Sequence, residues 1–256
     1  MVTSPRSQPF APRVVPVGDA AVMLELADAI DLAANERAQR VAAMVRVAEV
    51  DGVTDVVGAI ATVTVHFSAL TADQARSLRA RLHDLLLTAL HHAPGTDASD
   101  ERPPVAVPVC YDAAFAPDLA DVATATGLSA DEVVRLHVAS QHRVLMMGFA
   151  PGFAYIGGLD ARLAVPRRPT PRARLDAGSV AIAAGQTAVY PFATPGGWNV
   201  IGRTPLAMFD PAREPPSVLQ AGDRVAFVPI DAAAFARMAS EAASAAGRPP
   251  RGRAGR

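Results

Sequence analysis

The residues best suited to chemistry lie in the run Gly148-Phe-Ala-Pro-Gly-Phe-Ala-Tyr-Ile-Gly-Gly158. Its glycines allow positive φ angles and close backbone approach, and its aromatic rings offer flat apolar faces. Such a loop can line a pocket and present backbone N–H groups to an oxyanion or a carboxylate. The alternative is a barrel corner whose aromatic side chains fill the core. The candidate binding residues of this run are Gly148, Phe149, Pro151, Gly152, Phe153 and Tyr155.

Five arginines follow between positions 162 and 174, with three prolines and no acidic residue among them. Proline stiffens a loop and keeps guanidinium groups apart, an arrangement suited to binding carboxylate or phosphate. The alternative is a solvated loop, or a surface that faces an acidic partner protein. The arginines are Arg162, Arg167, Arg168, Arg172 and Arg174.

Three polar or aromatic residues further along complete the candidate site: Gln186, Tyr190 and Trp198. The Gln186 side chain both donates and accepts hydrogen bonds, so it could bind the edge of an amide or a lactam. Trp198 is the only tryptophan of the chain, and it either fills the core or offers a stacking surface. The six histidines lack metal-ligand spacing, so we expect no metal site. No Ser-His-Asp signature or G-x-S-x-G elbow identifies a catalytic residue.

The overall composition excludes several classes of function. The 24 basic and 25 acidic residues nearly balance, which argues against a general nucleic-acid binder. Every basic residue is arginine, which rules out a P-loop, Schiff-base or biotinyl lysine in this chain. Cys110 is the single cysteine, so no internal disulfide or thiolate cluster can form. Because no signal peptide or apolar stretch of about 18 residues is found, we expect a cytoplasmic protein without membrane contact.

The elements that must position these residues change in character near residue 100. The first half predicts a hairpin, a helix, one or two strands and a second helix capped by Thr71. These elements cover Val14–Val17 with Val22–Leu26, then Asp31–Val47, Val53–Phe67 and the helix after Thr71. They indicate a compact α+β domain.

The second half begins with a predicted strand, Val105–Tyr111, and two short helices, the later one opened by the capping box Ser129-Ala-Asp-Glu132. After these, short apolar runs alternate with Gly and Pro turns, which predicts a closed β-barrel or a sandwich. The runs are Val144–Phe149, Ser179–Ala184, Ala188–Tyr190, Val200–Arg203, Leu206–Phe209 and Arg224–Ile230.

These patterns divide the chain into two domains and three segments without a core. We expect a disordered N-terminus over 1–12, an α+β domain over 13–92 and a linker over 93–104. A mainly β domain over 105–232 follows, and a disordered tail over 239–256 ends the chain.

Four long strings in the second half carry a resemblance to a known family: GFAPGFAYIGGL, VPRRPTPR, AGSVAIAAGQTAVYP and TPGGWNVIGRTP. Through them the chain resembles the allophanate hydrolase subunit 1 family. That family includes the KipI-type kinase inhibitors, the B subunits of 5-oxoprolinase (PxpB) and part of the carboxyltransferase region of urea carboxylase. The likeness runs from about Val14 to Ile230 and is densest after Tyr111. It implies that the second domain is a cyclophilin-like barrel.

The resemblance also implies a function. It predicts a subunit of an ATP-dependent 5-oxoprolinase that opens 5-oxo-L-proline to L-glutamate and is inactive alone. The implied partners are the PxpC-like protein of the allophanate hydrolase subunit 2 type and the PxpA-like protein, with ATP and Mg²⁺ shared among the chains. On this hypothesis Arg167, Arg168 and Arg172 hold anions, the Gly148–Gly152 backbone polarises the carbonyl, and Gln186 binds the lactam.

Two other functions remain open at this point. One is a KipI-like regulatory protein that binds and inhibits a sensor histidine kinase. The other is peptidyl-prolyl isomerisation, which only the barrel shape suggests. The sequence also departs from the family pattern at Leu175-Asp176 and at Ala183-Ala184. The first departure adds a carboxylate beside the arginine loop, and the second restricts the backbone just before Gln186.

Overall fold

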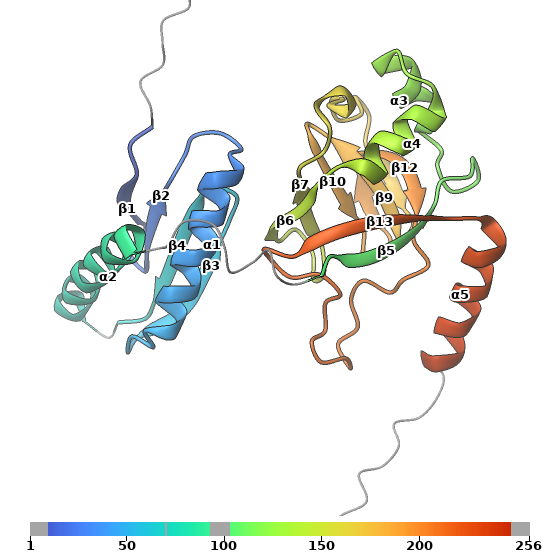
Figure 1. Ribbon diagram of the computed structural model, residues 1–256. Helices are drawn as coiled ribbons and strands as arrows, with labels where there is room; N and C mark the ends of the chain where they lie inside the picture. Colours follow the sequence, from blue (N-terminus) through green and yellow to red (C-terminus); the bar gives the residue numbers. More distant parts are fainter. Residues whose placement is uncertain (1–9, 70, 93–102, 247–256) are drawn as a thin grey trace, which may run out of the picture. The chain divides into compact units, whose positions relative to one another are not determined.

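A computed structural model of the protein describes residues 10–69, 71–92 and 103–246 (Figure 1). The chain forms two compact units, Met1–Glu101 and Arg102–Arg256. The expected fold class is confirmed, because the first unit is α+β and the second contains a closed barrel. Most of the expected disordered N-terminus (1–12), most of the expected linker (93–104) and residues 247–256 of the expected tail lie outside the described residues. Within those residues, no helix combines the length and apolar character needed to span a membrane.

The first unit is an antiparallel four-stranded sheet in the order β1-β2-β4-β3, with two helices packed against it. Its helices begin where the sequence predicts, because Asp31 accepts a bond from the Ala34 amide at 2.8 Å and Thr71 accepts one from the Gln74 amide at 3.2 Å. Its elements are β1 (Arg13–Val17), β2 (Ala21–Glu25), α1 (Leu32–Val47), β3 (Val53–Gly58), β4 (Thr62–Phe67) and α2 (Ala72–His92).

The second unit is built on a closed barrel in the order β10-β7-β6-β13-β5-β12-β9. Among the described strands, only β5 and β13 pair in parallel. A separate two-stranded ribbon joins β8 to β11. The barrel strands are β5 (Val105–Cys110), β6 (His142–Met147), β7 (Ala154–Gly157), β9 (Ser179–Ala183), β10 (Gln186–Val189), β12 (Asn199–Arg203) and β13 (Arg224–Ile230), and the ribbon strands are β8 (Arg172–Leu175) and β11 (Thr194–Gly196).

Alternate residues of the barrel strands belong to different hydrophobic clusters. Val180 of β9 and Val189 of β10 pack with residues from strands around the barrel, so this cluster fills the interior. Their neighbours Ala181 and Ala188 pack instead with a group of aromatic side chains. Because successive strand residues point to opposite faces, the aromatic group lies on the outer face of the barrel.

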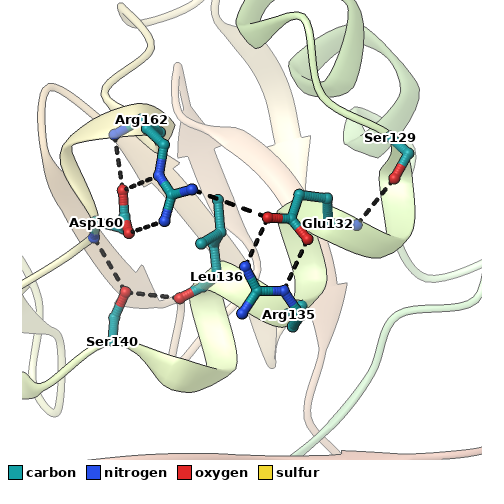
Figure 2. A network of polar contacts seen from close by, with 7 residues as sticks. All are labelled: Ser129, Glu132, Arg135, Leu136, Ser140, Asp160 and Arg162. Atoms are coloured by element: carbon teal, nitrogen blue, oxygen red, sulfur yellow. Dashed lines mark hydrogen bonds and ion pairs between the residues drawn. The ribbon is translucent and has the colours of Figure 1, made fainter.

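Helices close one end of the barrel, and a polar network joins two of them, α4 and η1 (Figure 2). The helices are α3 (Leu119–Thr126), α4 (Ala130–Ala139) and the 3₁₀ helix η1 (Ala161–Leu163). The predicted capping box forms, because Ser129 Oγ accepts a bond from the Glu132 amide at 3.2 Å. Ser140 Oγ links the end of α4 to η1 by donating to Leu136 O at 2.7 Å and accepting from the Asp160 amide at 3.0 Å.

Two expectations about the second unit are wrong. Leu206–Phe209 forms no strand; only an isolated bridge pairs Phe209 with Ser217. The expected disordered tail is helical up to residue 246, because α5 (Ala232–Ala246) continues through it. An aspartate caps this helix, since Asp231 accepts from the Ala234 amide at 2.7 Å. Its alanines favour helix, and Phe235 packs against Phe115 with the ring centres 4.4 Å apart.

Candidate functional site

Four of the candidate aromatic residues form one cluster on the outer face of the barrel. The Phe153 ring is central, 5.0 Å from the Tyr155 ring, 5.3 Å from that of Tyr190 and 6.3 Å from that of Trp198. All three contacts are edge-to-face, the arrangement that aromatic quadrupoles favour. The cluster is therefore tightly packed and apolar. Trp198 is only 5% exposed, so it mainly fills this cluster.

Gln186 lies beside this cluster at the start of β10. It pairs across the hairpin with Ala183, which belongs to the aromatic cluster, so both side chains share that face. Only 7% of Gln186 is exposed, and its Nε2 donates to no atom of the described chain. A buried amide without a partner costs free energy that a ligand acceptor would recover. This orphaned donor is the clearest sign of a binding site on the face.

The arginine loop has acidic partners in space although no acid lies within it in sequence. Asp118, which is completely buried, accepts from Arg168 Nη1 at 2.5 Å and from Arg172 Nη1 and Nη2 at 2.6 Å each. It also accepts from the Val200 amide at 2.7 Å. Hydrogen bonding to Asp118 raises the pKa of Arg172. The prediction that Arg168 and Arg172 bind anions is untested, but both guanidinium groups already hold a carboxylate of the protein.

The two outer arginines of the loop also have acidic partners. Arg162 pairs with Asp160 at 2.8 Å, as Figure 2 shows, and the bonds from Arg162 lower the Asp160 pKa to about 2. Arg174 lies 3.8 Å from Asp176. Asp176 also pairs with Arg203 at 3.1 Å and has no contact with Arg168 among the ion pairs of the described chain. The family departure at Asp176 thus acts on Arg174 and Arg203.

Arg167 differs from its four neighbours. Its guanidinium carbon lies 6.0 Å from the centre of the Trp198 ring, within the range of a cation–π contact. It makes no ion pair with the part of the chain that the structure describes. Burial raises the pKa of Tyr190, and the charge of Arg167 opposes that effect. Arg167 is therefore the candidate arginine that faces the aromatic cluster.

The glycine-rich loop contributes less to this face than predicted. The amides of Gly148, Ala150 and Phe153 donate to carbonyls within the loop at 2.8–3.1 Å, so these three N–H groups do not face a ligand. Phe149 has a φ of +68° and is 64% exposed, with its ring 5.1 Å from that of Phe153. The loop thus meets the aromatic cluster through side chains, those of Phe149, Ala150 and Phe153.

The other candidates of that loop line a separate cleft of about 430 Å³. The cleft is lined by Gly148, Pro151 and Gly152 together with Phe209, Pro215 and Pro216. Gly152 has a φ of +77°, and a Cβ there would lie 2.6 Å from the Phe209 Cβ, so only glycine fits. The structure therefore divides the candidate residues among the aromatic face, this cleft and the ion pairs that hold Arg168 and Arg172 on Asp118.

Sequence reasoning did not identify Asp118 as part of the site. It lies 50 and 54 residues before the arginines it binds, and no local pattern connects them. Two signals were available: Asp118 stands just before a short helix, which is an ordinary capping position, and it matches the pattern of the family that the chain resembles. Among the described residues, no group of three or more His, Cys, Asp and Glu side chains is placed to hold a metal ion.

Known proteins resemble this chain over most of its length. The family model of the carboxyltransferase domain, subdomain C and D, matches residues 12–219. The 5-oxoprolinase B subunit of Escherichia coli O157:H7 is 39% identical over 218 residues, which are 83% of this chain and 94% of that protein. The protein of the same name from Bacillus subtilis (strain 168) is 52% identical over 126 residues, which are 49% of this chain. That match covers 52% of the Bacillus protein, so the chain spans about half of that relative.

Solved structures show the same fold. PH0987 from Pyrococcus horikoshii is 35% identical with a TM-score of 0.52, over 87% of this chain and 99% of that one. TTHA0988 is 34% identical with a TM-score of 0.69, over 82% of this chain and 40% of that one. The urea carboxylase of Kluyveromyces lactis has a TM-score of 0.66 at 18% identity, over 94% of this chain and 24% of that one, which shows a shared fold alone.

Proposed function

Because the chain belongs to the family of the carboxyltransferase domain, subdomain C and D, and resembles three proteins named as the B subunit of 5-oxoprolinase, we propose that it is part of a cytoplasmic, ATP-dependent 5-oxoprolinase. In this proposal it acts with a PxpA-like protein and with a PxpC-like protein of the allophanate hydrolase subunit 2 type. The complex opens 5-oxo-L-proline to L-glutamate. The observation that carries the proposal is the unpartnered Nε2 of Gln186 beside an aromatic face and a free guanidinium group.

The chemistry of a lactam fits this face. A five-membered lactam ring is flat enough to lie on aromatic side chains, and its carbonyl accepts a hydrogen bond from an amide N–H. Water adds the oxygen to the carbonyl carbon, the ring C–N bond breaks, and the nitrogen takes the proton. Because a lactam is a stable amide, the proposed reaction is coupled to ATP hydrolysis. The chain has no lysine, so we place the nucleotide and its Mg²⁺ in a site completed by the partner proteins.

The test is activity of the assembled complex. The chain, co-expressed with its PxpA-like and PxpC-like partners, should release glutamate from 5-oxo-L-proline only when ATP is present, and the isolated chain should show no turnover. Gln186→Leu should lower kcat/KM of the complex about tenfold or more, since a donor to the substrate carbonyl is lost. Gln141→Leu, at an exposed glutamine, is the matched control and should leave kcat/KM unchanged. A complete complex that releases no glutamate would contradict the proposal.

A second candidate function rests on a different surface. The exposed Phe149 ring and the cleft lined by Phe209, Pro215 and Pro216 form an apolar region that could bind a segment of another protein. This favours the KipI-like alternative, a regulator that inhibits a sensor histidine kinase. Inhibition of kinase autophosphorylation by the isolated chain, lost in Phe149→Ser, would support it. The regulatory function would be excluded if the isolated chain has no effect on the kinase while Phe149→Ser leaves the oxoprolinase activity of the complex unchanged.

A further inference from the structure

Four of the five arginines between positions 162 and 174 hold an acidic side chain that comes from outside that stretch. Arg162 binds Asp160, Arg168 and Arg172 bind Asp118, and Arg174 lies near Asp176. Arg167 has no such partner in the described part of the chain, and lies over Trp198 instead. A positive charge that the fold leaves unpaired is the one that can bind an anion without breaking an existing ion pair.

The backbone on both sides of Arg167 is fixed. Before it, Asn199 Nδ2 donates to the Pro166 carbonyl at 2.9 Å, and Val165 O accepts from the Ala184 amide at 2.7 Å. After it, the Arg168 amide donates to Gly197 O at 2.7 Å. Ala184 stands two residues before Gln186, and Gly197 precedes Trp198. The loop is thus bound to the two segments that carry the other site residues, with Arg167 held between them.

The ion pairs to Asp118 complete this support. Asp118 is tied to β12 by its own amide, which donates to Val200 O at 3.0 Å, and by the bond that its carboxylate accepts from the Val200 amide. Through it, Arg168 and Arg172 connect the loop to the strand that follows Trp198. We therefore regard these two arginines as part of the structure that holds Arg167, and Asp118 as a positioning residue.

We propose that Arg167 binds the carboxylate of the substrate against the Trp198 indole, while Gln186 Nε2 donates to the carbonyl of its ring. This inference deepens the proposed function and rests on it. It names the ligand class, a flat cyclic amide with a carboxylate substituent. A single planar guanidinium group matches one carboxylate in charge and in geometry, whereas the phosphates of a nucleotide carry several charges. Arg168 and Arg172 do not touch the substrate in this arrangement.

The decisive experiment compares two ligands that differ only in the carboxylate, 5-oxo-L-proline and 2-pyrrolidinone. In the complex, Arg167→Ala should raise the KM for 5-oxo-L-proline about ten- to a hundredfold, as expected when a charge-assisted bond is lost. The inhibition constant of 2-pyrrolidinone and the KM for ATP should stay within about twofold. Arg167→Lys should recover part of the loss, because it restores the charge without the planar fork. Arg174→Ala is the matched control and should change none of these constants.

Two results would overturn the inference. Equally weaker binding of both ligands in Arg167→Ala would mean that the residue only shapes the loop. A raised KM for ATP alone would mean that it binds phosphate.

A separate test of the anion site uses the fluorescence of the single tryptophan. It is needed if the wild-type complex does not open 5-oxo-L-proline, because the proposed function then fails. In the isolated chain, 5-oxo-L-proline should change the Trp198 emission more than 2-pyrrolidinone does, and Arg167→Ala should remove the difference. Absence of that difference in the wild-type chain would refute the site.

Discussion

Asp118 is the residue on which the arginine loop depends most. Its carboxylate is completely buried and satisfies two guanidinium groups that are only 28% and 30% exposed. Removing one partner of a buried ion pair leaves the others uncompensated. Asp118→Ala should therefore lower the free energy of unfolding by about 3 kcal/mol or more, measured by chemical denaturation of the isolated chain.

Asp121 provides the matched control for this substitution. It also lies near Arg168, at 3.6 Å, but it is 74% exposed. Exposed pairs contribute little, so Asp121→Ala should change the free energy of unfolding by less than about 1 kcal/mol. Similar effects of the two substitutions would show that Asp118 does not hold the loop.

The same residues show what a sequence can and cannot predict at this scale. Arg167 and Gln186 were identifiable because their side-chain chemistry is evident from residue type alone. Which arginine is free was not identifiable, because the ion pair to Asp118 joins positions that only the closed barrel brings together. Charge balance over a short window therefore says little about charge balance in space.

At the scale of elements, α4 carries a histidine whose protonation the fold opposes. His137 is fully buried, and its Nδ1 lies 2.9 Å from the Tyr111 hydroxyl while its Nε2 lies 3.0 Å from Thr187 Oγ1. Thr187 Oγ1 in turn donates to Ala181 O, so a neutral His137 that donates from Nε2 satisfies every group. Burial, and to a smaller extent the charge of His142, lowers the pKa of His137 well below its usual 6.5.

This pKa predicts how stability depends on pH. Below about pH 6.5 the unfolded chain binds a proton at His137 and the folded chain does not, so stability falls as the pH falls. The free energy of unfolding should decrease by up to about 1.4 kcal/mol per pH unit for this histidine between pH 6 and pH 5. His137→Gln should lower stability at pH 8 and make the decline below pH 6.5 shallower. A variant with the wild-type slope would show that His137 is protonated in the folded state.

Capping signals predicted elements well, and apolar runs predicted them less reliably. The predicted caps at Thr71 and Ser129 each start a helix where expected, because a cap is a contact between residues three apart. The run Leu206–Phe209 is not a strand because it forms only an isolated β-bridge, from Phe209 to Ser217, although Met208 is buried in the barrel core and Phe209 lines the cleft. Burial there comes from the surrounding fold, which an isolated apolar run does not reveal.

For the whole molecule, the division into two units is the feature with the widest consequence. Each unit has its own hydrophobic core: Leu82 and Leu86 of α2 lie in the first, and Val144 of β6 and Phe227 of β13 lie in the second. A domain with a core of its own can unfold independently of its neighbours. The polar stretch near residue 100, with its prolines, allowed the two-unit organisation to be predicted, because it separates two segments that each have apolar residues of their own.

Independent unfolding can be tested with one substitution in each core. Leu82→Ala and Leu145→Ala remove the same atoms at positions that are both 0% exposed, so each should cost its own unit about 2–5 kcal/mol. In calorimetry of the full chain, Leu82→Ala should lower only the melting temperature of the first unit, and Leu145→Ala only that of the second. The transitions are assigned by a fragment of residues 103–256, which should keep the second transition alone. If either substitution shifts the whole unfolding profile as one cooperative transition, the units stabilise each other, and the two cores act as one.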